Sequence, residues 1–252
     1  MKVKNSVVFV LLTTALLTGT CLFGAASEVQ ASAKALGFFF NRISFTDTFY
    51  FDECGGFSST GSNRYFVLEP GFQIVLEGKQ GSHTDQSILT VLSETKTVNG
   101  VETRILENKE SRDGALTEIS RNYFAICNKT NSIFYFGEDV DTYENGAVVG
   151  HEGSWKAGEN GAQAGLQMPG IILLGARYAM EVAPSVAEDR SEILSMTETV
   201  KTAAGTFENC LKIKETSGIE KFTVGYKYYA PGIGLVKDEY FELTNYARQP
   251  AP

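Results

Sequence analysis

The chain has 252 residues, of which 43% are hydrophobic and 21% are charged, and its formal net charge is −8 at pH 7. This composition is typical of a globular protein and excludes an intrinsically disordered chain, and the length suits one large all-β domain or two small ones. Because an acidic surface repels phosphate backbones, we expect no nucleic-acid partner.

The first 31 residues have the features of a secretory signal peptide. Lys2 and Lys4 precede an apolar run from about Val7 to Leu17, and Val29-Gln30-Ala31 has the small-x-small form of a cleavage site. We therefore expect residues 1–31 to be removed and the mature chain to be exported to the periplasm or the outside of the cell. No later segment is long and apolar enough to span a membrane.

Two other interpretations of this N-terminal segment stay open. Residues 7–26 are free of charge and nearly long enough to remain as an uncleaved membrane anchor. Cys21 could carry a lipid, although Thr18-Gly19-Thr20 lacks the aliphatic residue that usually stands three positions upstream.

Residues 32–62 are predicted to form an aromatic N-terminal arm that ends in a Gly/Ser linker. We expect the aromatic side chains to pack against a sheet, and the alternative is an exposed patch for a partner. They are Phe38, Phe39, Phe40, Phe45, Phe49, Tyr50 and Phe51. The linker is expected between Gly55 and Asn63, where glycine and serine are frequent.

Residues 63–248 contain the turn signals of an antiparallel β domain. Asn99-Gly100, Asp113-Gly114 and Asn145-Gly146 favour two-residue type I′ hairpin turns, and Ala204-Gly205 marks a further turn. The runs between the turns are rich in β-branched and aromatic residues. We expect one curved antiparallel sheet, a half-barrel of about ten strands, with little helix beyond the signal peptide.

The segment TFENCLKIKE shows the clearest alternation. Phe207, Leu211 and Ile213 share one face, which is typical of a strand with one buried side. Cys210 then falls on the polar face with the lysines, unless a bulge shifts the register. Segments such as SIFYFG and KYYA are apolar on both faces, so we expect them at the centre of the sheet or along a cavity.

Residues 151–190 interrupt the series of predicted strands. The first half is rich in glycine and polar, and the second half contains the apolar tongue Met168–Leu174. Long loops are often functional, so the tongue could cover one mouth of the curved sheet, and the alternative is a core-packing insertion. Trp155, the only tryptophan, could stack on a ligand or fill the core.

GYKYYAPGIGLVKDE, residues 225–239, is predicted to be a corner between two strands. Pro231 cannot complete a central ladder, and Gly232 tolerates backbone shapes that other residues avoid. Tyr226 and Tyr228 should face one way and Tyr229 the other. All three tyrosines are candidates for lining a cavity or the core.

Reactive motifs are scarce in the chain. There is no metalloprotease helix, nucleophile elbow or phosphate-binding loop, and no motif implies a cofactor. Three weak constellations are present: Ser82, His83 and Asp85 close together in sequence, a possible metal site of His83 and His151 with a carboxylate such as Glu152, and the carboxylates Asp139, Asp141 and Glu144. We predict no catalytic and no metal-binding residues.

The cysteines of the mature chain, Cys54, Cys127 and Cys210, are far apart and include no Cys-x-x-Cys pair, which disfavours zinc. In an oxidising compartment two of them can pair and leave one free. The sequence leaves open which two pair, and whether all three are simply small buried side chains.

Several segments resemble a family of uncharacterised exported bacterial proteins with a YYAPGIGLVK motif. These segments are SNRYFVLEPGFQIVLEG, ISRNYFAICNKTNSIFYFGEDVD, GSWKAGENGAQAGLQMPG and the closing AAGTFENCLKIKETS with KYYAPGIGLVKD. The closing strands are also similar to the half-barrel of periplasmic lipoprotein carriers of the LolA/LolB type. That similarity implies an antiparallel sheet curled around a cavity for acyl chains, and function carried across it is analogy.

We therefore expect an exported, non-enzymatic envelope protein that binds a lipid or another hydrophobic molecule on an apolar concave face. The candidate ligand-lining residues are Trp155, Met168, Ile171, Leu173, Tyr226, Tyr228 and Tyr229. Alternatives are a secreted hydrolase that uses a carboxylate pair and a structural or surface protein without a small ligand. The oligomeric state is left open.

Overall fold

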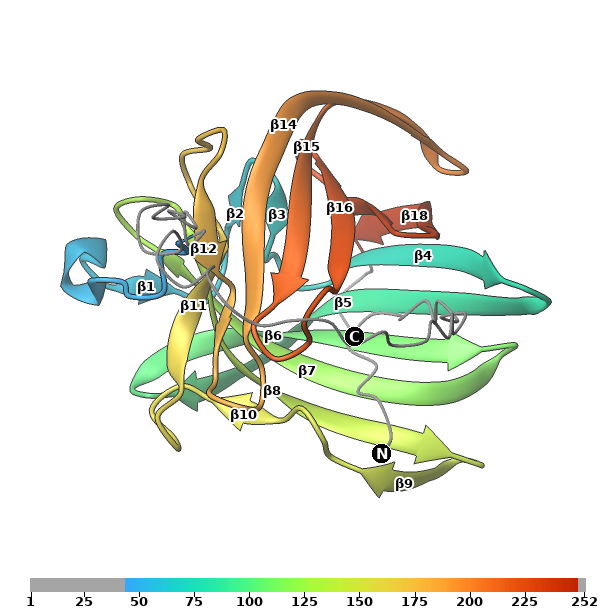
Figure 1. The fold of residues 1–252 in the computed structure, drawn as a ribbon, viewed down its shortest axis with the longest axis horizontal. Helices are drawn as coiled ribbons and strands as arrows, with labels where there is room; N and C mark the ends of the chain where they lie inside the picture. Colours follow the sequence, from blue (N-terminus) through green and yellow to red (C-terminus); the bar gives the residue numbers. More distant parts are fainter. Residues whose placement is uncertain (1–43, 249–252) are drawn as a thin grey trace, which may run out of the picture. The chain divides into compact units, whose positions relative to one another are not determined.

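The computed structural model describes residues 44–248, and this part of the chain is almost entirely β-structure (Figure 1). A short 3-10 helix, η1 (Phe51–Cys54), precedes the strands, and no helix among the described residues has the length and apolarity that a membrane crossing requires. The expected signal peptide lies outside the described residues. The expectation of a mainly β, antiparallel fold with little helix is confirmed.

The strands follow one another along the chain with short connections. In order they are β1 (Phe57–Ser58), β2 (Ser62–Asn63), β3 (Phe66–Val67), β4 (Phe72–Gln80), β5 (His83–Val98), β6 (Val101–Arg112), β7 (Ala115–Cys127), β8 (Ile133–Glu144), β9 (Ala147–Gly150), β10 (Trp155–Lys156), β11 (Gln163–Met168), β12 (Arg177–Ala179), β13 (Glu181–Val182), β14 (Asp189–Thr202), β15 (Gly205–Ser217), β16 (Val224–Ala230), β17 (Gly234–Asp238) and β18 (Phe241–Arg248).

One large antiparallel sheet contains almost all of these strands. Its spatial order is β12-β14-β15-β16-β17-β18-β4-β5-β6-β7-β8-β11-β13, and β14, β15 and β16 run across the direction of β4 to β8 (Figure 1). The two end strands, β12 and β13, are separated along the chain only by Met180, whose amide donates to the carbonyl of Asp189 at 2.8 Å. The sheet therefore nearly closes into a barrel, with more strands and further closure than the expected half-barrel of about ten.

The predicted hairpins occur where the turn dipeptides stand. Asn99, Asp113 and Asn145 have φ of 47°, 51° and 53°, and each is followed by a glycine that also has positive φ. Two successive residues with positive φ define a type I′ turn, whose twist matches that of the flanking strands. The hairpin between β14 and β15 turns at residues 203–204, so Gly205 already begins β15.

Cys210 is buried, although the sequence pattern groups it with polar residues, and a bulge precedes it in β15. Asn209 has a φ of 54°, and the pairing of β15 with β14 shifts between Cys210, opposite Glu198, and Phe207, opposite Val200. The extra residue shifts the phase of Phe207 relative to Leu211 and Ile213, whereas Cys210 stays in phase with Lys212 and is nevertheless fully buried, with a free thiol.

The N-terminal arm packs against the sheet within the described residues. Phe49 and Phe51 contact Phe134 edge-on, with ring centroids 5.4 and 5.1 Å apart, and a disulfide joins Cys54 to Cys127. Tyr50 is exposed, and residues 38–40 lie outside the described part.

The Gly/Ser stretch at residues 55–63 is held against the sheet as well. The Arg104 guanidinium donates to the carbonyl of Ser59 at 2.9 Å and to the Thr60 hydroxyl at 2.6 Å. Asn63, itself buried, donates its amide to the Met168 carbonyl at 3.4 Å.

The corner at residues 231–233 has the predicted form. Gly232 and Gly234 have φ of 76° and 104°, and β16 and β17 pair on either side of the bend. Tyr229 is buried, whereas Tyr226 and Tyr228 lie on the opposite face, where the Lys212 ammonium group sits over both rings at 4.8 and 5.4 Å.

Candidate functional site

The inner face of the sheet changes from apolar to charged along β15. Leu211 and Ile213 are buried in the core, and Glu215 follows in the same phase with only 13% of its side chain exposed. Across the neighbouring strand, Lys227 lies 2.8 Å from Glu215 Oε2 and 3.8 Å from Asp238. A lysine between two carboxylates is therefore largely removed from water on the concave side.

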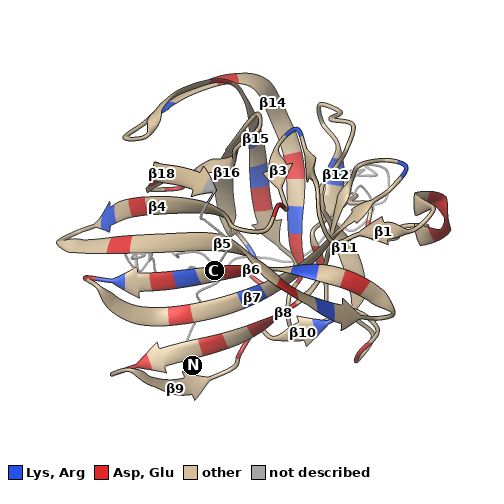
Figure 2. Ribbon diagram, turned by 180° about the vertical axis from the view of Figure 1, so that it is seen from behind, with Lys and Arg blue, Asp and Glu red and all other residues tan. Residues whose placement is uncertain are grey.

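Further carboxyl groups on other strands surround this pair. We call the whole set the lumen cluster: Glu110, Glu118, Glu138, Glu181, Asp189, Glu215, Asp238 and Lys227. Acidic and basic positions are spread over the strands concerned (Figure 2). Glu110 and Glu118 are direct cross-strand partners on β6 and β7, which is an unfavourable position for two ionised carboxylates.

The carboxyl pKa values show the effect of this crowding. Burial raises the pKa of Glu215 to about 7 and that of Asp238 to about 6, although Lys227 opposes the rise in both. Burial, together with the charges of Glu110 and Glu138, raises the pKa of Glu118 to about 8. Several carboxyl groups of the cluster therefore exchange protons near neutral pH, so they can both donate and accept hydrogen bonds.

Lys227 remains the cation of the cluster. Burial alone would lower the pKa of its ammonium group, but the Glu215 and Asp238 carboxylates hold that pKa well above its usual value. The two carboxylates therefore keep the Lys227 side chain positively charged.

Three buried polar atoms on adjacent strands have no hydrogen-bond partner within residues 44–248: Tyr178 OH, Ser191 Oγ and Glu215 Oε1. The register places Tyr178 opposite Ser191, and Ser191 opposite Glu215, so the three side chains form one row across β12, β14 and β15. Burial raises the pKa of Tyr178, and Ser191 lies close enough to oppose this rise, but the two hydroxyls do not reach hydrogen-bond geometry. Unpaired buried polar atoms are rare in folded proteins and indicate a missing partner.

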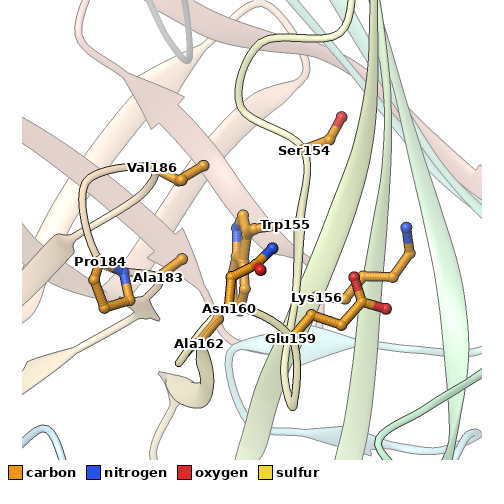
Figure 3. Close-up of a pocket in the computed structure, with 9 residues that line it drawn as sticks. All are labelled: Ser154, Trp155, Lys156, Glu159, Asn160, Ala162, Ala183, Pro184 and Val186. Atoms are coloured by element: carbon orange, nitrogen blue, oxygen red, sulfur yellow. The ribbon is translucent and has the colours of Figure 1, made fainter.

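A small pocket of about 210 Å³ lies between residues 154–162 and residues 183–186 (Figure 3). Trp155 stands in its wall and meets the Tyr135 ring edge-on at 5.3 Å. Its indole Nε1 is buried, and no described residue bonds it. Lys156, also in the wall, pairs with Asp139 at 2.5 Å.

The residues that the sequence predicts to line a ligand site lie in different environments in the structure. Trp155, Met168 and Tyr229 are buried, and among these Trp155 lines the pocket. Ile171 and Leu173 on the tongue are exposed, at 75% and 63%. Tyr226 and Tyr228 lie on the outer face with Lys212, away from the lumen cluster.

The weaker constellations are occupied by local ion pairs. His83 pairs with Asp113 at 2.5 Å, whereas His151 lies 2.9 Å from Asp141. Within residues 44–248 no group of three histidine, cysteine or acidic side chains is arranged to hold a metal ion. Asp139 is likewise engaged, since Lys156 and the Tyr123 hydroxyl both bond it.

Sequence reasoning missed the lumen cluster, although one signal was present. The alternation that places Leu211 and Ile213 inward also places Glu215 inward, which is an unusual position for a charge. Lys227 stands between Tyr226 and Tyr228, so their outward orientation implies that the lysine faces inward. The carboxyl groups on distant strands gave no comparable signal, because only the closure of the sheet gathers them.

Comparison with known proteins gives one match. A family model described as DUF3108-like, an uncharacterised family, matches residues 182–246, and this segment is similar to that family. The segment contains Asp189, Glu215, Lys227 and Asp238 of the lumen cluster. No curated protein and no solved structure matches the chain.

Proposed function

We propose that the chain is an exported, non-enzymatic binding protein of the cell envelope that holds a small polar molecule at the lumen cluster. The observation that carries this proposal is the row of unpaired polar atoms at Tyr178, Ser191 and Glu215. Leaving these groups desolvated without partners would cost about 1–3 kcal/mol each, so a ligand that bonds them recovers a large part of that free energy.

Two features support export. The N-terminal pattern is that of a signal peptide, and the Cys54–Cys127 disulfide is a form of cross-link that persists in oxidising compartments.

An apolar ligand, as in the carriers of the LolA/LolB type, stays a prediction with less support from the geometry. The apolar side chains of the inner face, such as Leu211 and Ile213, are packed into one core cluster with their neighbours. The groups left unpaired are polar, so we place the ligand's polar part at the lumen cluster.

Native mass spectrometry of the full chain, purified from the envelope of cells that export it, tests this function. We expect a bound small molecule that is released on denaturation and lost in the variant Ser191→Ala. A fluorescent fatty-acid probe tests the apolar ligand in parallel. A protein that carries no small molecule, and whose thermal stability no member of a library of polar metabolites raises, would sink the proposal.

A hydrolase is the second candidate, because raised carboxyl pKa values near a second carboxylate are typical of general acids. Glu215 and Asp238, on either side of Lys227, are the pair that could serve. A panel of glycosides and esters would need to show turnover that disappears in Glu215→Gln while the fold is retained. Without such turnover the binding function stands alone.

A further inference from the structure

We propose that the ligand of the lumen cluster is a small aliphatic amine whose ammonium group bonds Tyr178, Ser191 and Glu215. This inference rests on the proposed function and names the class of its ligand. It is drawn from the row of unpaired oxygens and from the charges that surround the row.

The row offers three oxygen atoms to one side of the lumen. Tyr178 and Ser191 are buried, with 3% and 0% of their surface exposed, and their hydroxyl oxygens can each accept a hydrogen bond. Glu215 Oε1 accepts as well, because only its other oxygen bonds Lys227. An ammonium group has three donors and no acceptor, so it suits a row that offers acceptor oxygens from three adjacent strands.

The charge of the surroundings selects the same ligand. Leaving aside Glu138 and Asp189, which have other interactions, the described part of the lumen cluster sets five carboxyl groups against one ammonium group, and Lys227 already bonds Glu215 and approaches Asp238. Glu181 and Asp189 act on one another, and burial and the charge of Glu138, with smaller contributions from Glu181 and Asp189, raise the pKa of the Tyr135 hydroxyl. A second cation is attracted by this excess, whereas a carboxylate or phosphate ligand is repelled.

The strength of binding should depend on pH through the whole cluster. The titratable and charged groups around the row are the eight of the lumen cluster, the hydroxyls of Tyr135, Tyr178 and Tyr229, and, beyond Glu110, the Asp85–Arg112 pair. Several of the carboxyl groups lose their protons between pH 5 and pH 8, so the negative charge of the lumen rises over this interval. A cationic ligand should bind more tightly as pH increases.

The test is calorimetric titration of the full mature chain with 1,4-diaminobutane at pH 8 and at pH 5.5. 1,4-Butanediol is the neutral probe of equal length, and succinate is the anionic one. We expect saturable binding of the diamine alone, at least tenfold weaker at pH 5.5. The variants Glu215→Gln and Tyr178→Phe should each weaken it at least tenfold, while Glu242→Gln, which removes an outer carboxylate paired with Lys237, should leave it unchanged.

The possible outcomes distinguish a failure of the amine proposal from a failure of the proposed binding function. Equal binding of diol and diamine, or a diamine affinity that Glu215→Gln and Tyr178→Phe both leave intact, overturns the amine and leaves a polar ligand in place. Absence of diamine binding together with binding of another polar metabolite does the same. If Glu215→Gln does not fold, Tyr178→Phe decides, because it removes only a hydroxyl.

Discussion

Lys227 shows how a single side chain sets the chemistry of the lumen. It has two carboxylate neighbours, and only 17% of its side chain is exposed. A charge in this position needs its partners, and the partners need it, because desolvation is costly for each of them. Any ligand site at this position therefore requires that Lys227 stays paired with its two carboxylates.

Replacement of this lysine should destabilise the fold. We expect Lys227→Met to lower the free energy of unfolding by about 3 kcal/mol at pH 8, because two buried carboxylates lose their counter-charge. At pH 5 the loss should shrink, since both carboxyl groups then take up protons. Urea unfolding at the two pH values measures the effect, with Lys237→Met, which breaks the more exposed pair with Glu242, as the control. Equal losses at both pH values would contradict this account.

At the scale of the elements, close backbone contacts allow the sheet to close. Gly165 on β11 lies so near the chain between β12 and β13 that a methyl group there would overlap the carbonyl of Met180. Only glycine lets the two ends of the sheet approach in this way.

We therefore expect Gly165→Ala to cost about 2–3 kcal/mol, because the backbone around Met180 must move. Gly146→Ala is the matched control, since it has open space around it and would suffer only the strain of its positive φ, about 1 kcal/mol. Thermal unfolding of the two variants compares them directly. A loss for Gly165→Ala no larger than that of the control would show that the closure tolerates a side chain.

The Cys54–Cys127 disulfide joins the N-terminal arm to β7 across 73 positions of sequence. Cross-links across loops of this length restrict the unfolded chain, and the chain-entropy estimate of their contribution is about 4 kcal/mol. We expect a reducing agent, or the double variant Cys54→Ser with Cys127→Ser, to lower the midpoint of urea unfolding by a corresponding amount. Cys210→Ser should leave the response to reductant intact. A midpoint that reduction does not change would exclude the cross-link as a source of stability.

The hairpins could be predicted from sequence, whereas the faces of the strands could be predicted only in part. Asn99-Gly100 and its counterparts specify a turn through local backbone preferences, so they need no knowledge of the rest of the chain. The face of Phe207 relative to Leu211 depends on a bulge at Asn209, which the pairing with β14 reveals. A pattern of alternating residues fails at such a point because its period assumes an uninterrupted ladder.

At the scale of the whole molecule, the site arises from closure of the sheet. Glu118 on β7 and Glu181 on β13 come from distant parts of the sequence, and each is an ordinary acidic residue in its own strand. From segments such as KYYA we expected an apolar concave face. That expectation did not consider that the residues in phase with the core include charged ones. A sequence identifies which residues alternate, but the strand order decides which of them meet.

The pH dependence of stability should report this gathering of carboxyl groups. Glu118 and Glu215 have pKa values raised to about 8 and about 7, above the value near 4.3 that glutamate has in an unfolded chain. Between those limits the folded chain binds more protons than the unfolded chain, so its stability falls as pH rises. Asp85 and Asp139 have lowered pKa values and act in the opposite sense, but only in more acidic solution.

We therefore expect maximal stability near pH 5 and a loss of about 2–4 kcal/mol by pH 8, measured as the free energy of urea unfolding across that range. Glu118→Gln carries a neutral side chain at every pH, so it should flatten the slope between pH 5 and pH 8. Glu94→Gln, at an exposed position on β5, should leave the slope unchanged. Stability that stays constant or rises over this interval would mean that the carboxyl groups of the closed sheet are ionised throughout, and that water reaches them more freely than their burial implies.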